Sequence, residues 1–263
     1  MVMFKIFMIG FNELGKFGRL GNQMFQYASL KGIAEKHHYE WCIPPSNFNH
    51  PDYEHQLFEI FNLISLKNIG YVPKHYPLVL ETKYPNFDAE LLSNCPDNIN
   101  LGGYFQTEKY FKHIKKEIKE DFTFKNNIIE PCKKIINKFK DCISIHIRRK
   151  DFVSMNESLS IEYYSKALSY FNNQKVIIFS DDKNWCKEQE LFQSSRFFIS
   201  PFNNATDLCL MTLCSGHIIA NSSFSWWGAW LSNSNTIICP SKWFSNDLIE
   251  NPRDIIVENW IKI

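Results

Sequence analysis

Residues 142–153 read CISIHIRRKDFV, a short apolar run that leads directly into two arginines and an aspartate. The run predicts a strand over residues 142–147, and His146 and Arg148 point the same way because strand side chains alternate. Guanidinium groups at the carboxyl end of a strand are poorly suited to a core. They suit a phosphate-bearing ligand, because arginine presents a planar fork of donors that matches phosphate oxygens. Taken alone, the stretch is equally consistent with a solvated Arg-Arg-Asp salt bridge at the end of a strand.

From residue 142 onward, apolar runs of strand length alternate with runs of helix length. Strands that alternate with helices predict βαβ units and a parallel sheet. We expect strands at residues 142–147, 175–180, 195–199, 216–220, 236–239 and 254–257, and helices at residues 161–172, 183–190, 205–214 and 222–232.

The first half of the chain opens in a similar way. The sequence predicts a buried strand, a glycine-containing loop, a helix with one apolar face and a second strand, at residues 3–9, 10–20, 21–37 and 41–43. Residues 44–100 show no clear periodicity and predict loops with short helices. A strand at 101–106 and helices at 108–121 and 126–140 follow. We therefore predict an α/β fold with two Rossmann-like domains, residues 1–130 and residues 131–263.

The bulk composition excludes several classes of protein. The chain has 263 residues and a net charge of +1, so it shows no electrostatic footprint for nucleic acid. Its 8 cysteines form no CxxC pair and no Cys/His cluster with zinc spacing, which predicts reduced thiols. Neither a secretory signal nor an apolar run long enough to span a bilayer is recognisable. We expect a cytoplasmic protein, and a peripheral position at the inner membrane face stays open.

Two further segments of the second half carry groups that could bind a nucleotide. Asn221, Ser222 and Ser223 lie between a predicted strand and a predicted helix, where backbone N–H groups and the helix dipole favour a diphosphate. The serines could equally cap the helix, and capping is compatible with phosphate binding. Asp207 falls at the start of another predicted helix, where it could accept hydrogen bonds from a purine base or act as a first-turn acid.

The strand predicted at 175–180 ends in Ser180-Asp181-Asp182. An acidic pair at this place could bind a metal ion. We favour the alternative that Asp181 or Asp182 caps the following helix, because the arginines already offer the positive charge that a diphosphate needs. We therefore expect neither a metal nor another cofactor.

Three tryptophans fall on one predicted helix. Trp226 and Trp230 lie four residues apart and share a face, which predicts core positions, whereas Trp227 falls on another face and could contact a sugar.

The segment GRLGNQ at residues 18–23 resembles a GxGxxG phosphate loop only superficially. Its glycines would let the backbone approach a ligand closely, with Asn22 and Gln23 as polar readers. A flexible turn with a capping asparagine is the alternative.

Four segments together carry a family resemblance: GRLGNQMFQYA (18–28), GYFQTEKYF (103–111), HIRRKDFV (146–153) and HIIANSSFSWWGAWL (217–231). In order and spacing they resemble the α-1,2-fucosyltransferases of glycosyltransferase family 11, and four co-linear motifs are far more specific than one. The resemblance implies a GT-B fold, in which an acceptor-side domain and a GDP-fucose-binding domain face each other across a cleft. It also implies metal-independent, inverting transfer from GDP-β-L-fucose to the 2-hydroxyl of a β-galactoside in a glycan.

The matched motifs imply roles for individual residues. Arg148 would bind the β-phosphate of GDP and Asn22 would lie near the reacting carbon, so both are expected to act in catalysis. His146 would contact the guanosine end and Asp207 would read guanine. Further donor contacts are expected from Gly21, Arg149, Asn221, Ser222 and Ser223. Acceptor contacts are expected from Gln23, Gln106 and Trp227.

Several alternatives stay open. Asp151 is the candidate general base next to the arginines, and Asn22 or a donor phosphate oxygen could guide the proton instead. The acceptor is expected to be a galactose-containing oligosaccharide, lipid-linked or free. The chain could also be a GDP-fucose-dependent enzyme with another acceptor or linkage, or a non-catalytic nucleotide-sugar binder. A nicotinamide-dependent enzyme is discounted, because the first loop lacks a proper GxGxxG and its following acid.

Overall fold

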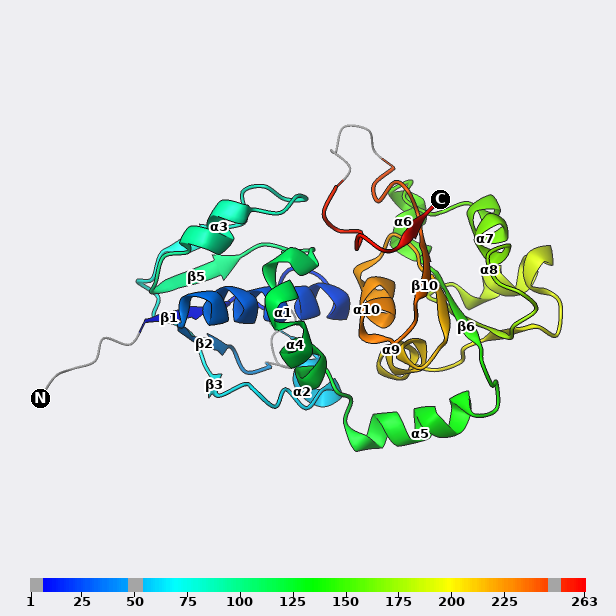
Figure 1. Ribbon diagram of the computed structural model, residues 1–263, viewed down its shortest axis with the longest axis horizontal. Helices are drawn as coiled ribbons and strands as arrows, with labels where there is room; N and C mark the ends of the chain where they lie inside the picture. Colours follow the sequence, from blue (N-terminus) through cyan, green and yellow to red (C-terminus); the bar gives the residue numbers. More distant parts are fainter. Residues whose placement is uncertain (1–6, 47–53, 246–251) are drawn as a thin grey trace, which may run out of the picture. The chain divides into compact units, whose positions relative to one another are not determined.

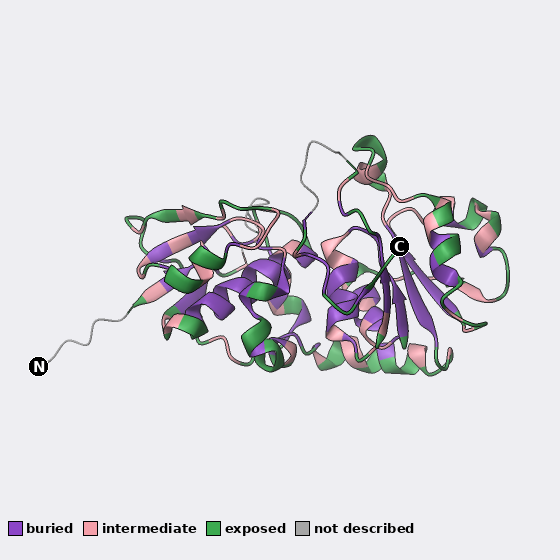
Figure 2. Cartoon of the chain, turned by 45° about the horizontal axis from the view of Figure 1, so that its top comes forward, coloured by how far each residue is buried: buried purple, intermediate pink, exposed green. Residues whose placement is uncertain are grey.

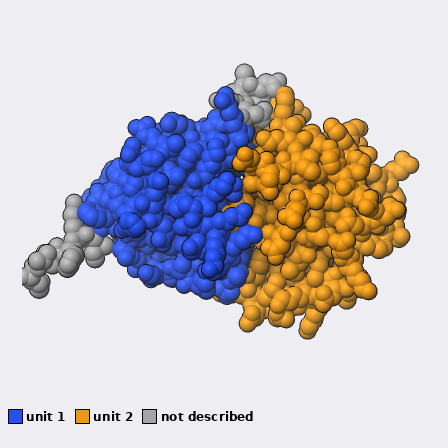
Figure 3. All heavy atoms as spheres, viewed as in Figure 1, with its two compact units in different colours: residues 1–123, 252–255 blue, residues 124–251, 256–263 orange. Residues whose placement is uncertain are grey.

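The computed structural model describes the chain over residues 7–46, 54–245 and 252–263. The chain divides into two compact units (Figure 3): unit 1 comprises residues 1–123 and 252–255, and unit 2 comprises residues 124–251 and 256–263. Each unit has its own parallel sheet with helices packed against it, which confirms the predicted α/β fold with two Rossmann-like domains. Within the described ranges, no helix combines the length and the apolar character needed to cross a membrane.

Unit 1 is built on a five-stranded sheet with the order β3-β2-β1-β5-β4, in which neighbouring strands are parallel. The strands are β1 (Met8–Gly10), β2 (Glu40–Ile43), β3 (Asn68–Ile69), β4 (Leu78–Leu80) and β5 (Ile99–Gly102). The chain winds outward from β1 to β3 and then continues on the other side of β1, so the direction of winding reverses between β1 and β5. In open α/β sheets, ligands bind beyond the carboxyl ends of the strands at such a reversal.

The helical elements of unit 1 are α1 (Leu20–His37), α2 (Leu57–Ile60), α3 (Ala89–Asn94), α4 (Lys115–Asp121) and the 3-10 turns η2 (Glu108–Tyr110) and η3 (Lys112–Ile114). α1 is buried along most of its length (Figure 2). It approaches η2 so closely that a Cβ atom at Gly32 would lie 2.2 Å from the carbonyl oxygen of Tyr110, which explains a glycine inside this helix.

A buried ion pair connects α1 to the end of α4. Lys31 Nζ lies 2.8 Å from Asp121 Oδ2, and the two side chains are 2% and 0% exposed. The Tyr27 hydroxyl donates to the same oxygen at 2.9 Å, and the Ser65 backbone N–H donates to Asp121 Oδ1 at 2.8 Å. The buried Asp121 carboxylate therefore has several hydrogen-bond donors inside the core.

Unit 2 is built on a six-stranded parallel sheet with the order β11-β10-β9-β6-β7-β8. Its strands are β6 (Ile143–Ile147), β7 (Val176–Ser180), β8 (Phe197–Ile199), β9 (Gly216–Ile218), β10 (Thr236–Cys239) and β11 (Ile261–Lys262). Counted from β6, the strands follow the 3-2-1-4-5-6 order of a Rossmann fold. The reversal of this sheet therefore lies between β6 and β9.

The helices of unit 2 are α5 (Asn126–Ile136), α6 (Lys150–Ser154), α7 (Ile161–Leu168), α8 (Lys183–Glu188), α9 (Asn204–Thr212) and α10 (Ser223–Leu231). α7 and α8 lie on one side of the sheet, and α9 and α10 lie on the other (Figure 1). The rings of Trp226 and Trp230 stack with centroids 5.8 Å apart and are buried, which confirms their predicted core positions.

Several predicted elements differ from the structure or lie partly outside it. The strand predicted at 101–106 is β5, which ends at Gly102, so residues 103–106 form a loop instead. The strand at 254–257 is wrong: these residues form no strand, and their apolar character reflects the burial of Ile255, Ile256 and Val257 instead. The helix predicted at 108–121 is broken into η2, η3 and α4, and the one predicted at 126–140 ends at Ile136. Most of the strand predicted at 3–9 lies outside the described residues.

Candidate active site

The carboxyl ends of β6 and β9 meet where the winding of the unit 2 sheet reverses. β6 ends at Ile147, so the Arg-Arg pair follows directly beyond this edge. β9 ends at Ile218 and leads through Asn221 into α10. The fold thus brings together two segments that are far apart in the sequence and that each carry candidate phosphate-binding groups.

The guanidinium group of Arg148 is held between two carboxylates. Its Nη1 donates to Asp181 Oδ2 and its Nη2 donates to Asp151 Oδ1. The Arg148 side chain is 13% exposed, whereas those of Asp181 and Asp151 are 17% and 37% exposed. A guanidinium group has five N–H donors, so two ion pairs can fix the direction of the fork without using all of them.

Arg149 is held by a second set of contacts. Its backbone N–H donates to Asp181 Oδ1 at 2.9 Å, so one carboxylate binds both arginines. Its guanidinium Cζ lies 4.0 Å from the ring centroid of Trp185, and its Nε lies 3.4 Å from Asp182 Oδ2. Asp182 also caps α8 by accepting the N–H of Trp185 at 3.1 Å, which confirms the capping interpretation for this residue.

His146 is buried at the end of β6, next to α10. Its ring centroid lies 5.5 Å from that of Phe224 in the first turn of α10. Burial and the positive charge of Arg148 lower the pKa of His146 to about 3, so its ring is neutral at physiological pH. Its Nδ1 is buried and has no hydrogen-bond partner among the described residues. A neutral imidazole ring can donate or accept a hydrogen bond to a ligand here, but it adds no positive charge to the site.

The segment between β9 and α10 combines a fixed asparagine with two serines. Asn221 Nδ2 donates to the carbonyl oxygens of Glu157 and Trp243, each at 3.0 Å. Ser222 occupies the N-cap position of α10, but its side chain makes no capping hydrogen bond, so the plain capping alternative does not hold for this serine. Ser223 is the first residue of the helix.

Asp207 lies in the first turn of α9, where Asn203 and not Asp207 is the N-cap. Its carboxylate accepts a hydrogen bond from Ser200 Oγ. Burial raises the pKa of Asp207 to about 6, although this hydrogen bond and the charge of Lys183 oppose the shift. The Asp207 carboxylate is buried and held by the hydrogen bond from Ser200. That it binds guanine stays a prediction.

The reversal of the unit 1 sheet brings two other predicted residues into contact. Gln106, in the loop after β5, donates from Nε2 to Oδ1 of Asn22, in the first turn of α1, at 2.8 Å. Gly18 has a φ of +88°, and a Cβ atom there would lie 2.0 Å from Asn22 Nδ2. A glycine is therefore required in front of Asn22 for both conformational and steric reasons.

Gln23 and Gly21 are buried in α1. Gln23 Nε2 lies 3.3 Å from the carbonyl oxygen of Glu54, and its Oε1 accepts the N–H of Gln56 at 3.2 Å. These bonds give Gln23 a structural role, and its acceptor contact stays a prediction.

Trp227 is fully buried. Its ring centroid lies 5.0 Å from that of Trp226 and 5.2 Å from that of Trp230. Trp227 is therefore a core side chain in this structure, which corrects the expectation that it faces a sugar.

The sequence did not indicate that Asp181 positions the arginines, because an acidic pair after a strand fits metal binding and helix capping equally well. The register pairs Ile147 with Ser180, so the next residues, Arg148 and Asp181, face each other across adjacent strands.

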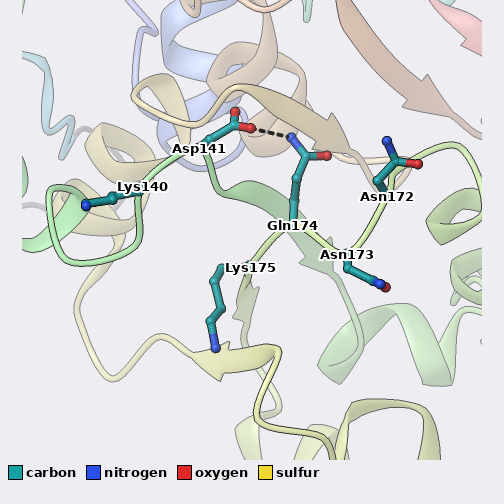
Figure 4. A pocket seen from close by; sticks show the side chains of 6 residues that line it. All are labelled: Lys140, Asp141, Asn172, Asn173, Gln174 and Lys175. Atoms are coloured by element: carbon teal, nitrogen blue, oxygen red, sulfur yellow. Dashed lines mark hydrogen bonds between the residues drawn. The ribbon is translucent and has the colours of Figure 1, made fainter.

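A surface hollow elsewhere on unit 2 is lined by residues that precede β6 and β7 (Figure 4): Lys140, Asp141, Asn172, Asn173, Gln174 and Lys175. It lies at the amino ends of the strands and is separate from the arginine site.

The fold is that of the GT-B glycosyltransferases. It is similar to the crystal structure of "NodZ alpha-1,6-fucosyltransferase soaked with GDP-fucose", with a TM-score of 0.59 and 12% identity over 89% of this chain and 94% of the other. The chain belongs to glycosyl transferase family 11, whose model matches residues 5–263, and this confirms the resemblance drawn from the four motifs.

Two curated relatives agree with this assignment. The chain is 34% identical to an alpha-1,2-colitosyltransferase of Escherichia coli, over 94% of this chain and 96% of the relative. It is 24% identical to the galactoside 2-alpha-L-fucosyltransferase SEC1 of Bos taurus, over 94% of this chain and 72% of the relative.

Proposed function

We propose that this protein is an inverting, metal-independent α-1,2-fucosyltransferase that moves fucose from GDP-β-L-fucose to the 2-hydroxyl of a β-galactoside in an oligosaccharide. The proposal is carried by the arginine site at the reversal of the unit 2 sheet, where Asp151 and Asp181 hold Arg148. Membership of family 11 and the fucosyltransferase names of relatives and structural neighbours support the choice of sugar and donor.

In this reaction, cleavage of the fucose–phosphate bond builds positive charge on the sugar and negative charge on the departing GDP. Arg148, fixed before the reaction by two carboxylates, would stabilise the developing phosphate charge. Ser222 and Ser223 would add hydroxyl and N–H donors at the start of α10. Because the acceptor hydroxyl attacks opposite the diphosphate in an inverting transfer, the reaction needs no covalent enzyme intermediate.

The acceptor hydroxyl must also lose a proton. Asp151 is the candidate base in unit 2, but its carboxylate is engaged by Arg148. Acting as a base would therefore require this ion pair to open when the donor binds, and the 37% exposed side chain of Asp151 has more freedom to move than that of Asp181. Asn22 or a donor phosphate oxygen is the alternative route.

A second donor is favoured by one observation: the relative with 34% identity is named a colitosyltransferase. Colitose is the 3-deoxy counterpart of fucose, so the same diphosphate-binding groups would serve both donors. The protein is incubated with lactose and EDTA, once with GDP-fucose and once with GDP-colitose. NMR of the product shows which sugar is transferred and to which hydroxyl, and so distinguishes the two donors. We expect fucose on O2 of galactose. Fucose at another position would overturn the linkage, and transfer from GDP-colitose alone would overturn the donor.

A further inference from the structure

Glu81 is a partly buried carboxylate beyond the end of β4, and it is bonded to the loop that follows β5. Its Oε2 accepts the backbone N–H of Tyr104 at 3.0 Å and that of Phe105 at 2.8 Å. Its own N–H donates to the carbonyl oxygen of Gly102 at 2.9 Å. One side chain therefore fixes two consecutive peptide groups of the GYFQ segment.

The backbone of this loop adopts a costly conformation at Phe105, two residues after a glycine with a positive φ. Phe105 has a φ of +53°, in the left-handed region that bulky residues rarely occupy, and Gly103 has a φ of +146°. Such conformations persist only where the surroundings determine them, and they concentrate at functional sites. The Phe105 side chain is fully buried, and its carbonyl oxygen accepts the Thr107 N–H at 2.8 Å. The two N–H bonds to Glu81 are part of what holds this turn.

The turn leads directly into Gln106, whose Nε2 donates to Asn22 Oδ1 at 2.8 Å. On its other side, Gln26 Nε2 donates to the carbonyl oxygen of Gly103 at 3.0 Å. Without the Glu81 carboxylate, the N–H groups of residues 104 and 105 would lose their acceptor. The backbone of Phe105 would then be free to relax toward negative φ, and Gln106 would move with it.

We propose that Glu81 is a positioning residue for the acceptor side of the transfer reaction, holding the strained turn at 103–105 so that Gln106 fixes the amide group of Asn22. The proposal rests on the proposed function, in which Asn22 lies near the reacting carbon. Glu81 itself touches neither substrate.

The electrostatic surroundings of Glu81 provide a readout that a purely structural side chain would lack. Burial and the Asp88 carboxylate raise its pKa to about 7, against the hydrogen bonds from the loop and from Tyr110. Tyr84 also faces it, and Lys83 pairs with Asp88 at 3.2 Å. The carboxylate accepts N–H bonds more strongly than the neutral acid does. Activity should therefore fall by no more than about threefold as the pH drops through 7, because the neutral acid keeps an oxygen that can still accept these bonds.

The variants Glu81→Ala and Glu81→Gln test the proposal, with the exposed Glu117→Ala as the matched control. We expect Glu81→Ala to lower kcat/KM for the galactoside about 10- to 100-fold, the scale of a misplaced reacting group, with GDP affinity by calorimetry unchanged. Glu81→Gln should stay within about threefold of wild type, because its amide oxygen can accept both N–H bonds, and should lose the decline below pH 7. Glu117→Ala should change neither quantity.

The Gln106→Ala background shows whether Glu81 acts through Gln106. In that background, Glu81→Ala should lower kcat/KM for the galactoside by less than about threefold, because the effects of coupled residues are not additive. A full loss in that background, or wild-type kcat/KM in Glu81→Ala, would overturn the proposal. Should Glu81→Ala not fold, an unchanged acid decline in Glu81→Gln overturns it instead.

Hydrogen exchange at the amides of Tyr104 and Phe105 separates this proposal from the proposed function. We expect faster exchange in Glu81→Ala and near wild-type exchange in Glu81→Gln. Unchanged exchange in Glu81→Ala would refute the role of Glu81, whatever the activity. Absence of any sugar transfer by the wild-type protein would count against the proposed function alone.

Discussion

Arg148 and Asp181 face each other because they directly follow Ile147 and Ser180, which are paired in register across β6 and β7. The register of the sheet thus places a carboxylate beside the guanidinium group that the proposed reaction uses. The other oxygen of the same carboxylate accepts the backbone N–H of Arg149 at 2.9 Å. Asp181 therefore orients both the side chain and the backbone at the end of β6.

Replacing Asp181 by alanine should lower kcat/KM for the donor about 10- to 100-fold, because the Arg148 fork loses the partner that directs it. Steady-state kinetics at varied GDP-fucose measure this effect. Asp141→Ala is the matched control, since Asp141 is an exposed aspartate at the amino end of the same sheet. Equal kinetics of the two variants would show that Asp181 does not orient Arg148.

Arg148→Ala should reduce the rate of transfer about 10²- to 10³-fold, the scale for one donor that stabilises developing charge. Arg148→Lys should recover little of this loss, because an ammonium group cannot reproduce a planar fork held by Asp151 and Asp181 together. Turnover of either variant close to that of wild type would refute the catalytic role.

Asp151→Asn distinguishes a base from an orienting residue. If Asp151 removes the acceptor proton, kcat should fall strongly and the pH dependence of kcat should change. If the carboxylate only orients Arg148, kcat/KM for the donor should fall while the pH dependence of kcat stays that of the wild type. The pH profile of kcat for wild type and variant, measured at saturating substrates, decides between the two.

Lys31→Met should lower the free energy of unfolding by about 3–5 kcal/mol, because it leaves the Asp121 carboxylate buried without its cation. Urea unfolding followed by fluorescence measures the change. Lys36→Met, on the exposed face near the end of the same helix, should stay within about 0.5 kcal/mol. A similar, small effect of both substitutions would mean that the buried pair contributes no stability.

The two buried histidines should each reduce stability as the pH falls from 6.5 toward 4, against the opposite contributions of Glu81 and Asp207, whose pKa values are raised. Burial lowers the pKa values of His146 and His217 to about 3 in the folded state, whereas an unfolded histidine titrates near 6.5. Between these values the unfolded chain binds the extra protons, so each histidine reduces the free energy of unfolding by about 1.4 kcal/mol per pH unit. Urea unfolding of the wild type and of His217→Gln at pH 6 and pH 5 isolates one such contribution. The free energy of unfolding of the wild type should fall by about 1.4 kcal/mol per pH unit more than that of the variant, and equal slopes would contradict this.

The regular half of the fold could be predicted from the sequence, because strands such as β6 and β7 are buried on both faces and read as apolar runs. β3 and β4 could not be predicted, since they are two and three residues long and have exposed side chains. They stand at the edges of the unit 1 sheet, where burial imposes no pattern. Trp227 is buried although it lies on another face than Trp226 and Trp230, because α10 is buried on several sides.

The residues of the candidate site also differ in whether the sequence around them indicates their role. Arg148 and Arg149 could be singled out because guanidinium groups at the end of a strand are poorly suited to a core, and their binding of a phosphate stays a prediction. The roles of Asp181 and Glu81 depend on which strands are neighbours and on backbone N–H groups far along the chain. No local pattern of residues reports such partners.

The most direct test of the account is GDP release from GDP-fucose by the wild-type protein in EDTA, with and without lactose. We expect release that depends on lactose and persists in EDTA. Release that ignores lactose would point to hydrolysis or to another acceptor. Tight binding of GDP without any release would contradict the proposed transfer and leave a nucleotide-sugar binder.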